Sequence, residues 1–336
     1  MITRDPSSFV RRAAHRLAAR AAIGIVFAFA APFTLAQEYP TRAVRIVVPF
    51  AAGGPADLYA RYLGQRLQEA LGQAFVIDDR PGAGSIIGTD VVAKSPADGY
   101  TLLLMSNTHT VNESLMPDKP FQLMRDFTPI APINSSDLVL VARSGLPVNS
   151  VKELIADAKA RPGALTYASS GPGTPYHMAG ELFKAMAGVS ILHVPYKGSS
   201  AARADVLGGQ VDLMFDAVTT MTEHIRAGKV KALGTSGLTR SAVLPDVPTI
   251  SESGVPGYEA TIWLGLMAPK NTPPKIVARL NAEVAKIVAD PETVKAWKAE
   301  GAAPMTMSTA EFARFLDADI VKWARIVKIS GAKPQQ

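Results

Sequence analysis

The segment VRIVVPFAAGGPADLYARYLGQRLQEAL, residues Val44 to Leu71, contains a strand, a glycine-rich turn and a helix, and it decides the fold class. Val44 to Phe50 is almost continuously apolar and rich in β-branched residues, which is typical of a parallel strand covered on both faces. Apolar residues then recur at helical spacing from Tyr59, and Gly72 is placed to end the helix. The segment therefore predicts the first unit of an α/β protein.

The turn in this segment is the first candidate binding surface. A glycine turn that opens a helix presents main-chain N–H groups at the positive end of the helix dipole, and this favours an anion. The glycine spacing fits neither nucleotide-binding motif, so no nucleotide site is predicted. Asp57 is expected to cap the first helical turn. On these residues alone, a tight turn without a ligand is an equal alternative.

Residues 1–36 have the pattern of a secretory signal peptide. Five arginines lie in the first 20 residues, Ala21 to Leu35 is apolar and uncharged, and Thr34-Leu35-Ala36 offers small residues at a cleavage site. The apolar stretch is shorter than the roughly 20 residues that span a bilayer, so a retained anchor is disfavoured. We expect export by the general route and cleavage.

Composition narrows the class of protein further. The predicted signal segment carries +4 of the formal net charge of +6, which leaves the mature chain near +2. No basic run is present, so no nucleic-acid partner is predicted. The absence of cysteine excludes disulfides and a lipid-bearing N-terminal cysteine. A soluble periplasmic protein is therefore expected.

The rest of the chain predicts two sets of alternating strands and helices. Residues 74–78 and 100–105 continue the first set as strands, and right-handed crossovers place the loops after the strands at one sheet edge. A second set follows, with its own loops after strands at 165–168, 191–194 and 211–215.

Two crossings between these sets are expected. A strand at 137–142 enters the second lobe, and the late helices from residue 274 return to cover the first. We therefore predict a first lobe of residues 37–138 plus 257–336 and a second lobe of residues 139–256. Two crossings make a hinge, with a ligand bound between the lobes.

The histidines give no metal-binding spacing, and neither a metal nor another cofactor is predicted. His177, in the first turn of a helix after the presumed cap Thr174, is expected either to bind a ligand or to hold the preceding loop. His193 is expected in the core. Asp216, at the end of a strand, is expected either to accept a hydrogen bond from a ligand N–H or to cap the next helix.

Ser170, His177 and Asp216 could form a hydrolase triad, which defines the alternative of an exported hydrolase. The sequence around Ser170 is not a G-x-S-x-G elbow, so catalysis is disfavoured. Lys197 either pairs with a ligand carboxylate or is a solvated turn residue, and Tyr196 either lines a site or packs on its lobe.

Five phrases together resemble one family: YPTRAVRIVVPFAAGGPAD, IDDRPGAGSIIGTDVVAKSPADGYTLLL, YASSGPGTPYHMAGELF, VPYKGSSAARADVLGGQVDLMFD and VPTISESGVPGYEA. They are similar to the extracytoplasmic solute receptors of tripartite tricarboxylate transporters, also called the Bordetella uptake gene family. The resemblance covers Glu38 to about Lys328. It implies a type II periplasmic binding protein, a Venus flytrap of two α/β lobes joined by two hinge crossings.

The same resemblance implies a monomer that is not an enzyme. Its ligand is expected to be a small organic acid, bound through main-chain amides, hydroxyls and waters, and its partners the large and small membrane subunits of the transporter. A sensor that hands the ligand-bound form to a signalling protein is an alternative that uses the same closure. By matching position, with Ala56, Ser85 and Lys197 added from the same loops, ligand-binding roles fall on Phe50, Gly53, Gly54, Ala56, Asp57, Ala83, Gly84, Ser85, Ser106, Asn107, Ser170, Gly171, Thr174, His177, Pro195, Tyr196, Lys197, Gly198 and Asp216.

Two positions depart from the family pattern. Ala56 stands where the family usually has threonine, and Ser85-Ile86 stands where it usually has Gly-Asn. Each lost hydrogen bond is worth about 1 kcal/mol net. The expected ligand is therefore less polar than a tricarboxylate, for instance an aromatic or short-chain acid.

Overall fold

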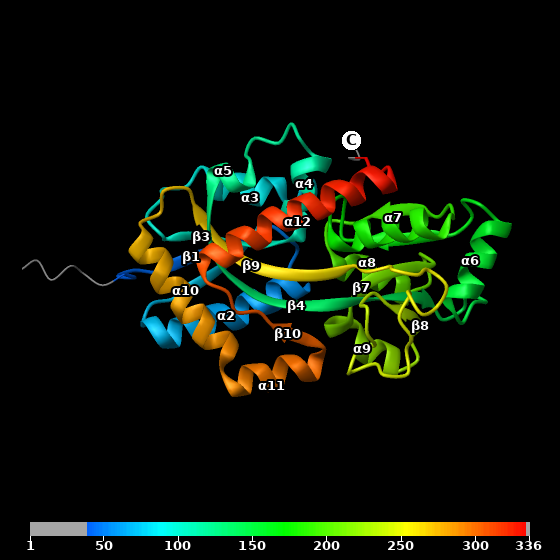
Figure 1. Cartoon of the computed structure of the whole chain (residues 1–336). Helices are drawn as coiled ribbons and strands as arrows, with labels where there is room; N and C mark the ends of the chain where they lie inside the picture. The colour runs from blue at the N-terminus through cyan, green and yellow to red at the C-terminus, as the bar shows by residue number, and fades with distance from the viewer. Residues whose placement is uncertain (1–38, 334–336) are drawn as a thin grey trace, which may run out of the picture. The chain divides into compact units, whose positions relative to one another are not determined.

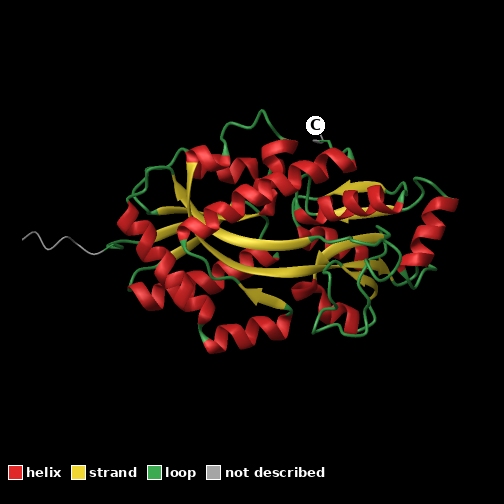
Figure 2. Cartoon of the chain, viewed as in Figure 1, coloured by secondary structure: helices red, strands yellow, loops and turns green. Residues whose placement is uncertain are grey.

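The computed structural model describes residues 39–333, so the predicted signal peptide lies outside the described residues. From Arg42 on, the chain forms one compact unit of mixed α/β structure (Figures 1 and 2). Its strands are β1 (Val44–Val48), β2 (Phe75–Asp79), β3 (Thr101–Ser106), β4 (Phe127–Arg143), β5 (Thr166–Ser169), β6 (Leu192–Pro195), β7 (Leu213–Ala217), β8 (Val230–Thr235), β9 (Thr261–Pro269) and β10 (Ala302–Pro304).

Helices cover both faces of these strands (Figure 2). The helices are α2 (Pro55–Leu71), α3 (Ile86–Ala93), α4 (Asn107–Leu115), α5 (Leu123–Asp126), α6 (Val151–Ala160), α7 (Pro175–Ala187), α8 (Ser199–Leu207), α9 (Val218–Arg226), α10 (Pro274–Ala289), α11 (Pro291–Glu300) and α12 (Thr309–Ser330).

The predicted opening unit forms as expected, with β1 at its centre. Val44, Ile46, Val47 and Val48 are completely buried, and β1 pairs in parallel with both β2 and β3. Gly72 ends α2 with a left-handed φ of 71°. The loops that follow β1, β2 and β3 therefore lie at one sheet edge, as predicted for a parallel βαβαβ unit.

A second parallel set consists of β5, β6 and β7, with β5 in the middle. We call these strands, β8 and the last part of β4 the second lobe. The first lobe contains β1, β2, β3, β9, β10 and the first part of β4. The strand order β2-β1-β3-β9-β4-β7-β5-β6 runs through both lobes without a break.

β4 is much longer than the strand expected at 137–142. It pairs antiparallel with β9 up to Asp137, and with β7 from Leu138. Its first part contains Pro129 and Pro132, and the pairing register shifts next to each of them. Prolines argue against a central strand unless they lie at such irregularities, and this is why the sequence did not indicate the full length of β4.

α12 extends beyond the first lobe, which the late helices were expected to cover. This helix contacts α4 in the first lobe and α7 in the second (Figure 1). Trp323 and Ile326, near its end, belong to the same buried cluster as Phe183 and Phe215 of the second lobe. A helix of 22 residues is roughly 33 Å long, enough to extend beyond one lobe.

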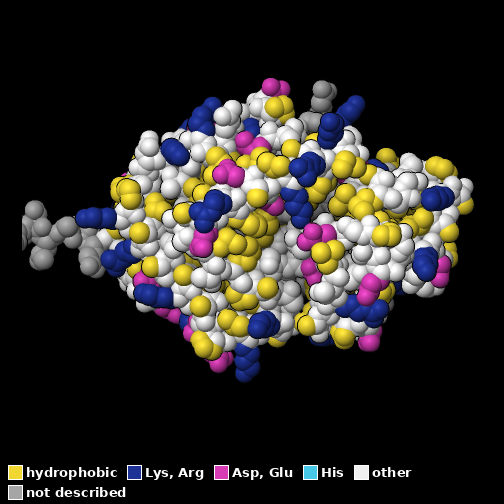
Figure 3. Space-filling view, in the orientation of Figure 1, with side chains coloured by type: hydrophobic (Ala, Val, Ile, Leu, Met, Phe, Trp, Pro, Cys, Tyr) yellow, Lys and Arg dark blue, Asp and Glu magenta, His cyan; other side chains and the backbone are white. Residues whose placement is uncertain are grey.

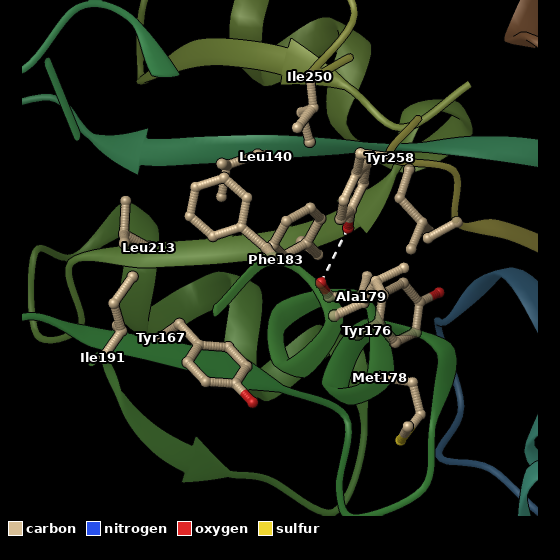
Figure 4. Packing of buried hydrophobic residues seen from close by; sticks show 14 of the residues in the cluster. Leu140, Tyr167, Tyr176, Met178, Ala179, Phe183, Ile191, Leu213, Ile250 and Tyr258 are labelled. Carbon is tan, nitrogen blue, oxygen red and sulfur yellow. Dashed lines mark hydrogen bonds between the residues drawn. The ribbon is translucent and has the colours of Figure 1, made fainter. Parts of the chain in front are cut away.

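The second-lobe core is a dense group of large side chains (Figure 4). Phe183 and Phe215 pack around Tyr258, which is fully buried and donates a hydrogen bond of 2.8 Å to the carbonyl of Ala179 in α7. Tyr258 lies in the Pro- and Gly-rich connection that precedes β9. The core thereby fixes a long irregular segment against a helix.

Within residues 39–333, no helix is both long and apolar enough to cross a bilayer. On the face shown in Figure 3, basic and acidic side chains are interspersed among neutral ones.

Tyr258→Phe tests the contribution of this buried hydroxyl. The substitution keeps the ring and leaves the Ala179 carbonyl without this partner, so we expect a loss of about 1 kcal/mol in the free energy of unfolding. Tyr258→Ala also removes the ring and is expected to cost about 3 to 5 kcal/mol. Urea denaturation measures both. Equal losses in the two variants would contradict the packing described here.

Candidate functional site between the lobes

The loops at the two sets of strand ends meet across a cleft. Ser200, at the start of α8 in the second lobe, donates a hydrogen bond of 3.0 Å to the carbonyl of Ala52 in the first. Gly198 lies directly against Ala51, and a Cβ atom at Gly198 would overlap the Ala51 side chain. The two lobes therefore contact each other, and the structure has a closed arrangement.

Two adjoining cavities lie in this cleft and share Phe50 and Ser170. The larger has a volume of about 460 Å³ and lies among the loops that follow β2, β5 and β6. The smaller, of about 30 Å³, lies at the start of α2 and is lined in part by Ile262 and Leu264 of β9, and we call it the inner cavity and the larger one the outer cavity. The lining of the inner cavity is mainly apolar.

The lining of the larger cavity favours a negatively charged ligand. Lys197 is the one charged side chain among its lining residues, and none of these is an Asp or Glu. Ser85 and Ser170 also line it, and their buried hydroxyl oxygens have no hydrogen-bond partner within residues 39–333. Buried hydroxyls are nearly always hydrogen-bonded, so these two indicate that a ligand or water binds there.

The first loop is held in shape from inside the protein. Asp57 accepts a hydrogen bond of 2.8 Å from the amide of Gly53, which has a φ of 76°, and forms an ion pair with Arg61 at 2.6 Å. The carboxylate is almost fully buried and does not line either cavity. Asp57 therefore holds the turn before α2 through the Gly53 amide, whereas the sequence had predicted that it caps the amides of the first helical turn.

His177 holds the loop between β5 and α7. Its Nδ1 accepts a hydrogen bond of 3.2 Å from the amide of Gly173, while Thr174 caps the helix. Burial lowers the pKa of His177 to about 4, so the ring is neutral at pH 7. Of the two predicted roles, the structure shows the loop-holding one.

His193 is only partly buried, in contrast to the expectation of a core residue. The Nε2 atom of this ring lies 2.6 Å from the hydroxyl of Ser169, and the rings of His177 and His193 are 4.3 Å apart. Partial burial and the neighbouring His177 lower the pKa of His193 to about 3. β6 is the last strand of its lobe, so one side of His193 remains accessible.

The hydrolase triad considered for Ser170 is not assembled. The Ser170 hydroxyl has no partner in the described chain, and Nδ1 of His177 is bound by Gly173. Asp216 is completely buried, pairs with Arg203 at 2.6 Å and accepts from the amide of Ala217 at 2.8 Å. Asp216 thus stabilises the start of α9, and within residues 39–333 neither His177 nor Asp216 forms a hydrogen bond with Ser170.

Ser106 and Asn107 lie at the start of α4, where the sequence had indicated only a loop. Ser106 caps this helix and lines the smaller cavity, while the Asn107 side chain donates to the carbonyl of Thr261 at 2.9 Å. The segment from Asn107 to Leu115 is rich in Thr, Ser and Asn, which are weak helix formers. Capping and burial therefore determine this helix.

Most of the residues predicted for the site line one of the two cavities. These are Phe50, Gly54, Ala56, Ala83, Gly84, Ser85, Ser106, Ser170, Gly171, Thr174, Pro195, Tyr196, Lys197 and Gly198. Five others adjoin the loops without lining a cavity, namely Gly53, Asp57, Asn107, His177 and Asp216. A ligand contact by any of these residues stays a prediction.

Sequence reasoning missed several apolar lining residues. Met116 follows the unrecognised helix α4, Tyr176 is the second residue of α7, and Ile262 and Leu264 alternate along β9. The alternation in β9 was the available signal, because side chains two apart in a strand share a face. Nothing in the sequence indicated which face meets the cleft.

Comparison with known proteins gives the family. The sequence pattern of the tripartite tricarboxylate transporter family receptor matches residues 59–332. The chain belongs to this receptor family. BugT of Bordetella pertussis is 41% identical to this receptor over 318 residues, which cover 93% of the chain and 97% of BugT.

Solved structures of related receptors have the same two-lobe binding-protein fold. Rpa4515 of R. palustris, solved with adipate, is 38% identical and gives a TM-score of 0.86 over 89% of this receptor and 100% of that chain. MatC of Rhodopseudomonas palustris, with bound malate, is 32% identical and gives a TM-score of 0.82 over 86% of this receptor and 100% of MatC. The periplasmic binding protein BugD is 37% identical and gives a TM-score of 0.84 over 88% of this receptor and 100% of BugD.

The neutral state of His177 makes the stability of this receptor depend on pH. Its pKa is about 4 in the folded chain against 6.5 normally, so the unfolded chain binds more protons between these values. Stability therefore falls as the pH drops from 6.5 towards 4. His177→Asn keeps an acceptor for Gly173 and is expected to remove about 3 kcal/mol of this loss.

Urea unfolding at several pH values between 4 and 7 measures this effect. His224→Asn, at a partly exposed position near the end of α9, is the matched control and is expected to change the pH dependence less. An unchanged pH dependence in His177→Asn would show that His177 is not held neutral by the fold.

Proposed function

We propose that the protein is a periplasmic receptor that captures a small carboxylate between its two lobes and delivers it to the membrane subunits of a tripartite tricarboxylate transporter, without chemistry. The observation that carries this proposal is the pair of buried, unpartnered hydroxyls of Ser85 and Ser170. They come from opposite lobes and line one cavity whose single charged side chain is Lys197. Such a lining suits an anion that touches both lobes at once.

The related receptors support the class of ligand. Rpa4515 is solved with adipate and MatC with malate, and both are dicarboxylates. In this chain, one carboxylate is proposed to bind near Ser170 and the loop that contains Gly171. Lys197, exposed at the edge of the cavity, is a suitable partner for a second negative group.

The cleft also supports a ligand with an apolar body. Ala56 lines the inner cavity with Pro55, Ile262 and Leu264, and Met116 and Ile86 line the outer one. None of these side chains can donate a hydrogen bond. We therefore propose an aliphatic or aromatic acid in preference to a tricarboxylate.

We propose that the hinge lies where β4 and β9 cross between the lobes. β4 exchanges partners between Asp137 and Leu138, which supports the predicted limit near residue 138. Tyr258 packs in the second-lobe core and Ala260 bonds to Ser236, so we place the return crossing at about Thr261, a few residues after the predicted limit of 257. Export by residues 1–36 and a monomeric state are part of the proposal.

Calorimetry and thermal shift against adipate, malate, benzoate and citrate test the proposed ligand class. We expect binding by at least one mono- or dicarboxylate, with citrate weaker, and recovery of the acid unchanged after incubation. Ser170→Ala removes a proposed donor and is expected to weaken binding about tenfold without loss of folding. No stabilisation by any of these acids would contradict the proposed function.

Gly198→Ala tests closure. Its Cβ would overlap Ala51 only when the lobes are together, so the variant is expected to fold normally but to bind the carboxylate at least about tenfold more weakly. Gly208→Ala, at the other end of α8 with a φ of −79°, is the matched control and should bind normally. Equal affinities of the two variants would refute the closed arrangement as the binding state.

A further inference from the structure

A second cavity lies between the lobes, apart from the carboxylate cleft. Its volume is about 230 Å³, and its walls come from α2 and α11 of the first lobe and from α9 of the second. It shares no lining residue with the two cavities of the cleft. The lining residues are Leu58, Tyr59, Tyr62, Thr219, Thr220, Ala296, Trp297 and Glu300.

One wall of this cavity is a cluster of three aromatic rings. The ring of Trp297 meets those of Tyr59 and Tyr62 edge to face, with centroid distances of 5.1 and 5.5 Å. Tyr59 and Trp297 are almost fully buried, and the Tyr62 hydroxyl is fixed by Thr293 at 2.6 Å. The rings are therefore held rigidly before any ligand arrives.

Glu300 gives the cavity a negative charge. It is the one charged residue of the lining, and no Lys or Arg within residues 39–333 forms an ion pair with it. The Tyr59 hydroxyl donates to its Oε2 at 3.4 Å, and burial together with Glu300 raises the pKa of Tyr59, so the tyrosine stays neutral. A carboxylate without a cation thus faces an aromatic wall.

We propose that this cavity, defined as the α2–α9–α11 site, binds a small organic ammonium ion. Aromatic faces attract cations through the ring quadrupole, and quaternary ammonium groups are often recognised by aromatic clusters. Glu300 supplies the opposite charge, and Thr219 and Thr220 supply hydroxyls on the facing wall. The negative charge of Glu300 repels an anion. This cavity therefore prefers a cation, whereas the carboxylate cleft prefers an anion.

Calorimetric titration of the purified protein with choline at constant ionic strength tests this proposal. The probe is compared with 3,3-dimethylbutan-1-ol, a neutral molecule of nearly the same shape. We expect choline to bind and the alcohol to bind at least about fivefold more weakly, because only the cation gains from the rings and Glu300. No carboxylate is present, so the result is independent of the proposed transport function.

Two variants locate the binding site. Glu300→Gln is expected to weaken choline binding about tenfold, and Tyr62→Leu about fivefold. Glu292→Gln, an exposed carboxylate on the same helix outside the lining, is the matched control and should bind choline like the parent protein. Circular dichroism and thermal unfolding check that Tyr62→Leu and Glu300→Gln both remain folded.

Several outcomes would overturn the proposal. Failure of choline to bind at up to tens of millimolar would do so, as would equal binding of choline and the neutral alcohol. An equal loss in Glu300→Gln and Glu292→Gln would show general charge attraction in place of a site.

Discussion

The exchange of strand partners along β4 is the constraint on which the rest of the structure depends. This strand pairs with β9 up to Asp137 and with β7 from Leu138, so a single extended segment belongs to both lobes. The carboxyl ends of two separate parallel sets are thereby turned towards one cleft. Each set alone offers loops with amides and hydroxyls; only their apposition creates a space that a small molecule can contact on both sides. The cavity at Ser170 and the second one at Glu300 both follow from this arrangement.

Charged and titratable groups near the cleft mainly hold its loops in shape. Asp57 binds the Gly53 amide, His177 binds the Gly173 amide, and Asp216 is neutralised by Arg203. Each group is buried and satisfied within the protein, so the loops are ordered before a ligand arrives. Preorganisation of this kind reduces the entropy lost on binding. It also leaves the hydroxyls of Ser85 and Ser170, together with Lys197, among the polar groups that line the space.

Much of the fold was predictable from the sequence because its signals are local. The β-branched run at Val44 gave β1, apolar spacing and Gly72 gave the helix α2, and the glycine turns gave the cleft loops. The misses have physical causes. α4 consists of weak helix formers stabilised by the Ser106 cap, and the prolines of β4 are tolerated at irregular pairings. Met116, Ile262 and Leu264 were missed because their position in the cleft depends on how distant elements pack.

α12 adds a mechanical consequence to this picture. Its side chain Asp319 accepts hydrogen bonds from Thr110 at 2.6 Å and from Trp263 at 3.2 Å in the first lobe, whereas Trp323 and Ile326 belong to a buried cluster with residues of both α4 and α7. If the lobes separate while α12 stays with α4, the contacts of α12 with α7 must be lost. Exposing that surface costs about 25 cal/mol for each Å². Opening that breaks the contacts between α12 and α7 therefore carries a free-energy cost, which favours the closed form.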